Sequence, residues 1–476
     1  MTDRLLLPDP TDLDGLRQRL AFGDGIHGRR PIGMRRIRIG ADALEHLADD
    51  VAEIRRDGPV VVVMDRTPMR RGATDLKQHV LATLSDCFPT RPAVLGEAGA
   101  ELHADEAALA EADGHVRDAG CVVSVGSGTI TDIAKDASMR AGGIPFVVVQ
   151  TAVSVNAFSD DMAVLLRDGV KRTVPSRWPD VLLVDLGVLA DTPAAMNQAG
   201  FGELCSMFTA PADWYLANAI GMDDGYDPEV VALFRDGADG LLTNATQVGA
   251  GDPAMLAELA ARMTLTGIAM GVAGRTAPLS GTEHLLSHLL DMAAGVAGRP
   301  LAFHGAQVGV AGVLAATLWA DTLDRLDPGR LTVDAAFPDP AVVERRVRAA
   351  FDPMDPSGRM ADECWRDVHR KLERWSADRA GVAAFAAEWD RHRTTLRGLV
   401  AAPETLREAL GRAGAAARID QLDPPAPAPV VRWAVGALPL MRDRFTVADL
   451  HFLAGDWDDA TVDDLLARSG IAGDVG

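Results

Sequence analysis

One glutamate and three histidines occur in contexts that favour metal binding. His284 and His288 are four residues apart in SGTEHLLSH and share one face if this segment is helical. His304 follows in LAFHGAQVGV, and Glu203 stands in the apolar segment AGFGELCSMFTA. A catalytic zinc site has three protein ligands and one open position, and a carboxylate commonly completes a mixed set. The alternative is that the histidines are ordinary surface or core residues and that Glu203 caps a helix.

A second chemical signal is the glycine pair Gly126 and Gly128 in VVSVGSGTITDIAKDAS, where an apolar run is followed by a helical pattern. Glycine lets backbone N–H groups approach a ligand without an intervening Cβ. The helix N-terminus adds free donors and a positive dipole end, which favours a pyrophosphate. Asp132 falls in the first turn of that helix. A tight strand-to-helix turn with an acidic start explains the same spacing.

Asp65 ends the apolar run PVVVVMD. An acid in that place can hydrogen-bond a ribose hydroxyl, and its charge repels a 2′-phosphate, which favours NAD over NADP. A turn or helix cap is an equally good explanation of Asp65.

These residues depend on elements that the sequence pattern predicts. Period-two alternation predicts a strand at 34–40, and short apolar runs predict strands at 59–65, 121–125, 145–150 and 180–185, with a helix over 41–54. Continuous apolar strands between helices indicate a parallel sheet covered on both faces. Ala/Leu-rich helical patterns replace strands after about residue 190. We therefore expect an α/β Rossmann-like domain over 1–190 and an all-α domain over 191–476, with a Pro-rich loop at 423–431.

The bulk composition restricts partners and compartment. The chain has 476 residues, 48% hydrophobic content and a net charge of −21, which disfavours nucleic acid and anionic membranes as partners. No apolar run approaches 18 residues, and the N-terminus lacks a signal core. The four scattered cysteines argue against a disulfide framework and fit a reducing compartment. We expect a cytoplasmic homo-oligomer that acts on a small molecule, without nucleic-acid or membrane partners.

Taken together, these segments resemble glycerol-1-phosphate dehydrogenases, within the superfamily of dehydroquinate synthases and iron-containing alcohol dehydrogenases. VGSGTITDIAKDAS is similar to the family's dinucleotide turn, and VVVQTAVSVNAFSDDMAVLLRDGVKRTV to its T-A-P-S-x-D-G and D-G-x-K segments. SGTEHLLSH and FHGAQVGV resemble its histidine segments, and PDVLLVDLGVLADTPAAMNQAGFGELCSMFTAPADW the segment with its carboxylate ligand. MRDRFTVADLHFLAGDW is like its C-terminal helix.

The resemblance implies a dehydroquinate synthase-like fold with the active site between its two domains. It implies NAD or NADP, and one divalent metal, usually zinc, on Glu203, His284 and His304. His288 would contact the substrate or relay a proton, and Glu203 and His288 are the expected catalytic residues. Asn156 and Lys171, with Glu203 and His288, are the expected substrate contacts. The expected cofactor contacts are Asp65, Gly126, Ser127, Gly128, Thr129, Ile130, Asp132, Thr151, Ser154 and Asp160.

Several positions depart from the family pattern. Glu203 replaces the usual aspartate, although dehydroquinate synthases use glutamate there, and Met207 replaces a lysine. Asn156 replaces the substrate-contacting aspartate, Val153 a proline, and Asp160 a serine. Arg275 lies two positions before the expected arginine. These changes cluster where a phosphorylated substrate would be held, so the fold and metal are better supported than the substrate.

The leading hypothesis is an NAD(P)-dependent, metal-dependent dehydrogenase that interconverts dihydroxyacetone phosphate and glycerol 1-phosphate, or a related polyol or ketose phosphate pair. One alternative is a cyclase like dehydroquinate synthase, or a specialised-metabolism dehydrogenase on the same fold. Another is a non-catalytic homologue that binds nucleotide or serves in an assembly. Metal content and steady nicotinamide turnover separate the three.

Overall fold

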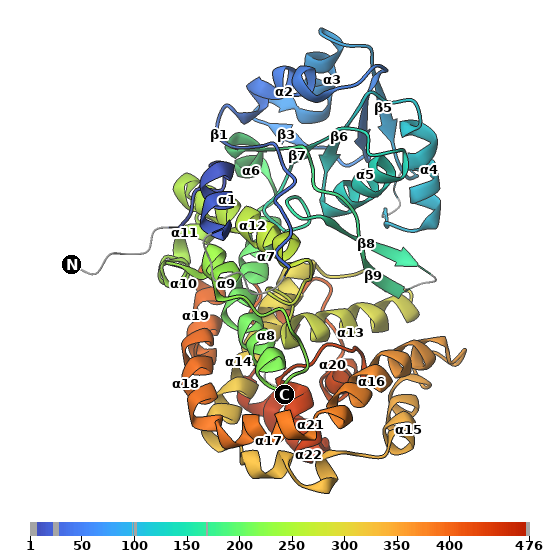
Figure 1. The fold of residues 1–476 in the computed structure, drawn as a ribbon. Coiled ribbons are helices and arrows are strands. Elements are labelled where there is room, and N and C mark those ends of the chain that lie inside the picture. Colours follow the sequence, from blue (N-terminus) through green and yellow to red (C-terminus); the bar gives the residue numbers. More distant parts are fainter. Residues whose placement is uncertain (1–6, 22–27, 98, 100–101, 168–169, 473–476) are drawn as a thin grey trace, which may run out of the picture. The chain divides into compact units, whose positions relative to one another are not determined.

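The computed structural model describes residues 7–21, 28–97, 99, 102–167 and 170–472, without the side chains of residues 167, 170 and 171. The chain forms two compact units (Figure 1). Unit 1 contains Met1–Phe201 and Glu229–Arg275, and unit 2 contains Gly202–Pro228 and Thr276–Gly476. The chain thus leaves unit 1 and returns to it for one group of helices. We keep the boundary near residue 190 as a proposal for where the strand-rich region ends.

Unit 1 is built on a six-stranded sheet of order β1-β10-β7-β6-β2-β5, and every neighbouring pair is parallel. The predicted parallel sheet is therefore confirmed. Five of its strands match the predicted runs, and β5, which the pattern missed, contains Pro92. Proline cannot donate to a strand ladder, and β5 lies at the sheet edge, where that loss is tolerated. The strands are β1 (Arg36–Gly40), β2 (Val60–Met64), β5 (Thr90–Val94), β6 (Cys121–Gly126), β7 (Phe146–Gln150) and β10 (Val181–Asp185).

The sheet core explains why the strand runs are continuously apolar. All five residues of β2 are buried, and Val60 and Val62 share a hydrophobic cluster with Val51 of α2 and Val80 of α3. Helices on both faces leave no side of an inner strand for polar side chains. Two antiparallel ribbons accompany the sheet, β3 (Arg70–Arg71) with β4 (Thr74–Asp75) and β8 (Met162–Arg167) with β9 (Val170–Pro175).

The helices of unit 1 follow the predicted α/β alternation. The predicted helix at 41–54 is a 3-10 turn followed by an α-helix, and the long apolar helix α12 packs on α6 and β1. Their bounds are α1 (Leu13–Ala21), η1 (Ala43–His46), α2 (Leu47–Ile54), α3 (Leu76–Ser85), α4 (Glu106–Val116), α5 (Gly128–Arg140), α6 (Leu186–Asp191), α7 (Ala194–Leu204), α9 (Pro228–Arg235), α10 (Asp239–Thr243), α11 (Thr246–Gly249) and α12 (Pro253–Ala273). The end of α7, from Gly202 onward, belongs to unit 2.

The described residues of unit 2 form helices and no strands, as the sequence predicted for the C-terminal part. Its centre is the pair α13 (Thr282–Val296) and α14 (His304–Arg325), and α14 also packs on α19 and α22. Around them lie η2 (Cys205–Phe208), α8 (Ala210–Ala219), η3 (Pro328–Leu331), η4 (Asp334–Ala336), α15 (Pro340–Phe351), α16 (Arg359–Ala377), α17 (Arg379–Ala387), α18 (Trp389–Leu399), α19 (Pro403–Ala413), η5 (Ile419–Gln421), α20 (Ala428–Ala437), η6 (Leu438–Leu440), α21 (Val447–Leu453) and α22 (Asp459–Ser469).

Two helices, α12 and α14, are long and apolar enough to cross a membrane by length and composition. In each, 83% of the most apolar window is buried inside the structure. Central helices of a packed helical core have the same composition.

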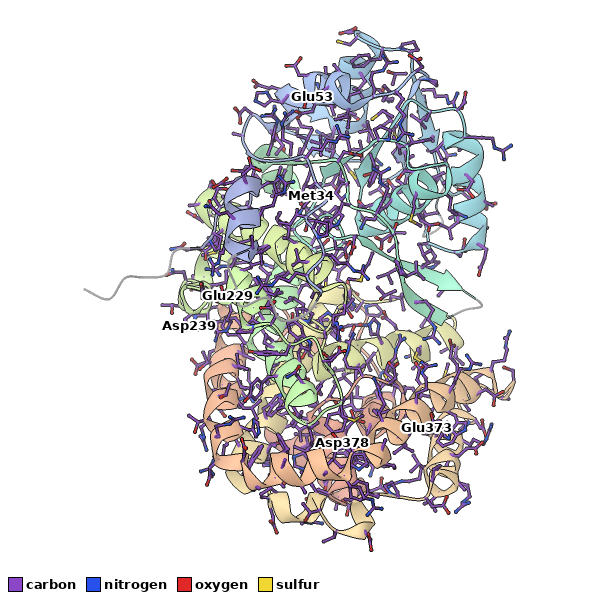
Figure 2. The ribbon with its side chains drawn as sticks, in the orientation of Figure 1. Met34, Glu53, Glu229, Asp239, Glu373 and Asp378 are labelled. Carbon is purple, nitrogen blue, oxygen red and sulfur yellow. The ribbon has the colours of Figure 1, made fainter. Side chains whose placement is uncertain are left out.

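Exposed acidic residues occur on both units, whereas other acids are buried. Figure 2 labels exposed acids on separate elements: Glu53 on α2, Glu229 on α9, Asp239 on α10, Glu373 on α16 and Asp378 before α17.

Candidate metal centre and dinucleotide turn

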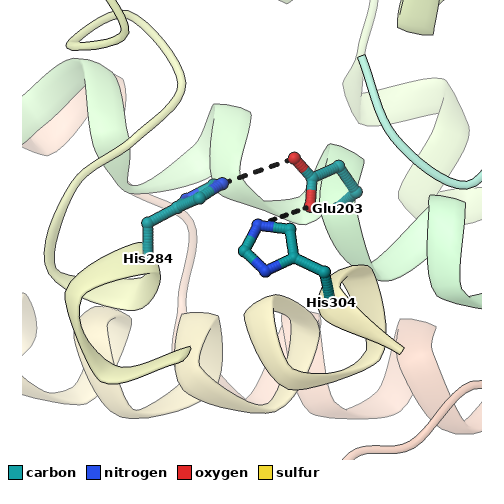
Figure 3. Close-up of side chains that lie close together, drawn as sticks. All are labelled: Glu203, His284 and His304. Atoms are coloured by element: carbon teal, nitrogen blue, oxygen red, sulfur yellow. Dashed lines mark hydrogen bonds and ion pairs between the residues drawn. The ribbon is translucent and has the colours of Figure 1, made fainter. Parts of the chain in front are cut away.

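Glu203, His284 and His304 form one compact cluster in unit 2 (Figure 3). Nε2 of His284 lies 3.3 Å from Oε1 of Glu203, and Nε2 of His304 lies 3.8 Å from Oε2. One ligand atom from each of the three residues lies within 4.8 Å of the others. Glu203 and His284 are buried, whereas the His304 side chain keeps 23% of its exposure. The structure therefore brings together the three residues that the sequence proposed as metal ligands.

Glycine packing brings the end of α7, which carries Glu203, against the start of α14, which carries His304. A Cβ on Gly202 would lie 2.3 Å from the carbonyl oxygen of Gly305, closer than any real contact allows. Gly309 of α14 packs against the same residue, because a Cβ added to Gly309 would lie 2.9 Å from the Cα of Gly202. The close approach of these backbones requires the small residues.

His284 is oriented by the residue before it. Its Nδ1 lies 3.0 Å from Oε1 of Glu283, which also accepts the Gly281 N–H at 2.6 Å. Thr209 donates its hydroxyl to Oε2 of Glu283 at 2.8 Å. Because an ionised carboxylate only accepts, Nδ1–H of His284 donates to Glu283, and Nε2 is the atom directed at Glu203.

His304 is oriented by a hydrogen-bonded chain. The Ser287 hydroxyl donates to Oε1 of Gln307 at 2.7 Å, and Nδ1 of His304 lies 3.0 Å from the same hydroxyl. Since that hydroxyl has already used its proton, it accepts from Nδ1–H of His304. The Nε2 atom of His304 consequently faces Glu203, as the Nε2 atom of His284 does.

The electrostatics of the cluster favour positive charge. Burial alone would lower the pKa of His284, but the Glu203 and Glu283 carboxylates outweigh it and raise that pKa to about 9. A cation that binds here displaces the proton on Nε2, because a histidine ligand is neutral. Two imidazole nitrogens and one carboxylate, each held by further hydrogen bonds, are a donor set that suits zinc.

The N-terminus of α13 is fixed by side chains from distant segments. Asp213 accepts the N–H and hydroxyl of Thr282 at 2.7 and 2.9 Å and the Val447 N–H at 2.9 Å. Arg444 donates to the backbone oxygen and hydroxyl of Ser280. Burial, with the nearby Glu283 charge, raises the pKa of Asp213 to about 7. These contacts hold the helix that presents both histidines of SGTEHLLSH.

His288 lies beside the cluster without joining the three candidate ligands. Its ring centre is 6.4 Å from that of His284 and 5.6 Å from that of His304, and the side chain is half-buried. The i, i+4 spacing does place both histidines of α13 on one face, as expected. Its catalytic and substrate-binding roles stay predictions.

In unit 1, the glycine turn has the expected form. Gly126 ends β6 and α5 begins at Gly128, with Ser127 between them as the N-cap. The N–H groups of Gly128, Thr129 and Ile130 belong to the first turn, which has no intrahelical acceptors for them. A Cβ on Gly128 would lie 2.7 Å from Cγ2 of Val155, so at least one reason for this glycine is packing against the segment after β7.

The carboxylates of two expected cofactor contacts, Asp132 and Asp160, interact with other residues of the protein. Nζ of the buried Lys135 donates to Oδ1 of Asp160 at 2.5 Å and to the carbonyls of Ala157 and Met162. Asp132 accepts the Val164 N–H at 3.1 Å and lies 3.7 Å from Lys135. Burial raises the pKa of Asp160 to about 6, although Lys135 opposes that shift. Both acids therefore tie α5 to the segment 157–164.

The other expected contacts lie mainly after β7. Thr151 donates its hydroxyl to the Gly126 carbonyl at 2.7 Å, Ser154 is buried, and Nδ2 of Asn156 faces Sδ of Met270 at 4.0 Å. Lys171 belongs to β9, and its side chain lies outside the described residues. Asp65 follows β2 and is paired with Lys77. The roles of these residues in binding stay predictions.

Sequence reasoning missed the residues that orient the ligands. Glu283 and Ser287 stand in the same SGTEHLLSH segment as the two histidines, and Gln307 follows His304. Their polar character in an apolar helical context was an available signal. Met207, where the family has a lysine, is fully buried in η2 and presents no charge.

Comparison with known proteins identifies the family of the chain. Residues 38–193 match the family model described as iron-containing alcohol dehydrogenase. The chain is 29% identical over 335 residues to a glycerol-1-phosphate dehydrogenase [NAD(P)+] of Bacillus licheniformis, covering 70% of this chain and 79% of that one. It is 31% identical over 284 residues to the enzyme of the same name from Haloquadratum walsbyi, covering 60% and 77%.

Solved structures of lower identity share the fold. Glycerol dehydrogenase from Schizosaccharomyces pombe matches with a TM-score of 0.57 at 12% identity, covering 93% of each chain. Maleylacetate reductase from Agrobacterium tumefaciens matches with a TM-score of 0.52 at 16% identity, covering 93% of this chain and 97% of that one. At these identities the likeness concerns the fold alone.

Proposed function

Because this chain belongs to the glycerol-1-phosphate dehydrogenase family and is an NAD(P)-dependent oxidoreductase, we propose that it interconverts dihydroxyacetone phosphate and glycerol 1-phosphate with a bound divalent metal. The observation that carries the metal dependence is the cluster of Glu203, His284 and His304, whose ligand atoms lie within 4.8 Å of one another. Two histidines and a carboxylate with an open position suit zinc and also iron(II), and zinc is the ion that we propose.

When bound, the metal polarises the ketone oxygen as a Lewis acid, and the nicotinamide supplies or accepts the hydride. Glu203, His284 and His304 would hold the cation, with their orientation fixed by Glu283 and Ser287. His288 would move the proton of the alcohol hydroxyl through a ring nitrogen, since histidine titrates near neutral pH.

The glycine turn would hold the cofactor. The N–H groups of Gly128, Thr129 and Ile130 at the start of α5 would donate to the pyrophosphate, where the helix dipole favours negative charge. Thr151, bonded to the Gly126 carbonyl, would keep the strand-to-helix turn in shape. Lys135 with Asp132 and Asp160 would support the same helix from within the protein.

The phosphate is the part of the substrate that most needs testing. Met207 is buried where the family has a lysine, and Asn156 replaces its aspartate. The test is a panel of dihydroxyacetone phosphate, dihydroxyacetone and pentose and hexose ketose phosphates, followed by nicotinamide absorbance with metal-stripped and zinc-reconstituted protein. We expect zinc-dependent oxidation of NADPH or NADH with dihydroxyacetone phosphate.

Equal activity before and after metal removal would contradict the metal-dependent reaction. Product formation without net nicotinamide turnover would instead indicate a cyclase.

We also propose a cytoplasmic homo-oligomer. The absence of a disulfide among Cys87, Cys121, Cys205 and Cys364 supports a reducing compartment. Light scattering after size exclusion measures the oligomeric state directly.

A further inference from the structure

The side chain of Asp213 caps two helices of unit 2 at once. Its Oδ2 accepts the N–H of Thr282, the first residue of α13, at 2.7 Å, and its Oδ1 accepts the N–H of Val447, the first residue of α21, at 2.9 Å. The first N–H groups of a helix have no intrahelical acceptor, so both ends gain from the same buried carboxyl group. The start of the helix that carries His284 is therefore fixed to the start of α21.

Gly281, the residue before α13, shows how closely this helix start is packed. A Cβ on Gly281 would lie 2.4 Å from Oδ2 of Asp213 and 3.1 Å from Oε2 of Glu283. Glu283 is also the acceptor that orients Nδ1 of His284, at 3.0 Å. A displacement of the start of α13 consequently reaches the carboxylate that orients a candidate metal ligand.

Residues 443–449, which we call the bracing segment, contact the same helix start at a second point. Arg444 of this segment donates to the backbone oxygen and the hydroxyl of Ser280 and to the hydroxyl of Thr276. Ser280 and Thr276 belong to the loop that leads into α13. The bracing segment thus holds the loop through Arg444 and the first turn of α13 through the cap that Val447 shares.

Helix α16 holds the bracing segment with two side chains one turn apart. Nζ of Lys371 lies 2.5 Å from Oδ1 of Asp449, and both side chains are buried. The indole of Trp375 stacks on the ring of Phe445, with ring centres 5.6 Å apart and 12° between the planes. Lys371 and Trp375 are four residues apart on α16 and so share one face of this helix.

The ion pair of Lys371 and Asp449 is completed by further hydrogen bonds. Nζ of Lys371 donates to the Pro439 carbonyl at 3.0 Å, and Oδ2 of Asp449 accepts the N–H and hydroxyl of Thr446 at 2.8 and 3.2 Å. Loss of one partner would leave an unpaired buried charge, which is strongly destabilising. The ion pair therefore fixes the position of the bracing segment against α16.

We propose that the bracing segment is a positioning element for the metal ligand His284, with Lys371 and Trp375 as its anchors on α16 (Figure 1). The inference rests on the proposed function only in requiring that Glu203, His284 and His304 bind a metal. The coupling is reciprocal, because an ion that binds best to the braced arrangement also stabilises it. Zinc should therefore order the bracing segment as well as the ligands.

The first experiment measures zinc affinity by competition with a chromogenic chelator, with folding checked by circular dichroism. Phe445→Leu loses the stacked ring pair but keeps an apolar side chain, and Lys371→Met loses the ion pair. We expect each to bind zinc about fivefold more weakly or worse, the lower end of coupling between distant sites. Val382→Ala is the control, because it makes a cavity in α17 of the same unit and should keep the zinc affinity within about twofold.

The second experiment is hydrogen exchange of the wild-type chain with and without zinc. Zinc should slow the exchange of amides at the start of α21, including that of Val447, more than the exchange of amides in α17. A role of residues 443–449 in general stability alone does not predict this difference.

The outcomes separate the inference from the proposed function. Folded Phe445→Leu protein with wild-type zinc affinity overturns the inference, as does an equal loss of zinc affinity in Val382→Ala, and the metal-dependent reaction then still stands. Unchanged exchange at Val447 on zinc addition also overturns it. If Lys371→Met does not fold, Phe445→Leu decides the question. Wild-type protein that binds no zinc overturns both the inference and the proposed metal dependence.

Discussion

Nε2 of His284 lies 3.3 Å from Oε1 of Glu203, although 81 residues separate them in the chain. Both side chains are buried, and Nδ1 of the same imidazole is bonded to Glu283. The imidazole is thus held between two carboxylates, one from its own helix and one from α7. This relationship carries the metal hypothesis, and four predictions follow from the contacts around it.

Replacement of His304 by alanine removes one of the three candidate ligands. We expect His304→Ala to lose bound zinc and dehydrogenase activity, because two remaining ligands hold the ion too weakly. The helical unit should still fold, since His304 is the most exposed member of the cluster. Metal content by mass spectrometry and unfolding by circular dichroism measure the two effects. His369→Ala, a partly exposed histidine on α16, is the control, and full zinc content in His304→Ala would refute the ligand assignment.

Glu283 should control metal affinity without being a ligand. In Glu283→Gln the amide can no longer serve as an anionic acceptor for Nδ1–H of His284, so the imidazole loses its orientation and basicity. We expect zinc affinity to fall about 10- to 100-fold, the scale seen for partners of ligating histidines. Competition with a chromogenic chelator measures the affinity. Glu373→Gln, on the exposed face of α16, should bind zinc like the wild type.

Gly202 should set the distance between Glu203 and His304. The Cβ of Gly202→Ala would lie 2.3 Å from the Gly305 oxygen, so the end of α7 has to move away from α14. We expect a loss of stability of about 1–3 kcal/mol from overpacking. Zinc affinity should fall about tenfold or more, as when ligand positioning is disturbed.

Gly312→Ala on α14 is the matched control, because nothing lies within 4 Å of its added Cβ. If Gly202→Ala bound zinc as tightly as this control, the packing argument for the site would be wrong.

Asp213 should make stability depend on pH. Its pKa is raised to about 7 from the ordinary 3.8, mainly by burial and also by Glu283, so the folded state favours the protonated carboxyl. The contribution of the protonated Asp213 carboxyl to the free energy of unfolding is fully present below about pH 4 and is lost as the pH rises towards 7. The free energy of unfolding falls by no more than ~1.4 kcal/mol per pH unit for this one proton. Arg444 faces the same region and opposes the loss.

The measurement is the urea midpoint of wild type and Asp213→Asn between pH 5 and 8. The variant should be less stable at low pH, because an amide cannot accept from both Thr282 and Val447, and its pH slope should be flatter. Asp352→Asn, an exposed acid, is the control. If the urea midpoints of the wild type and Asp213→Asn changed equally with pH, Asp213 would not be the group responsible for the pH dependence.

The local sequence determined much of this protein. Four apolar runs predicted β2, β6, β7 and β10, because only a sheet covered on both faces buries every residue of such a run. The period-two alternation of 34–40 predicted β1. The i, i+4 spacing of His284 and His288 fixed their common helix face, and the glycine pair fixed the strand-to-helix turn at Gly126. Each of these features depends on residues close together in the chain.

The tertiary structure decided which side chains meet. Only the folded structure shows that Lys135 forms an ion pair with Asp160 and that Lys77 forms one with Asp65. It also shows that residues 229–275 belong to unit 1. A buried carboxylate or ammonium needs a partner, and that partner can come from any segment that the fold brings within about 3 Å. Residue spacing in the sequence does not identify such partners, so the roles of these acids could not be predicted from their motifs.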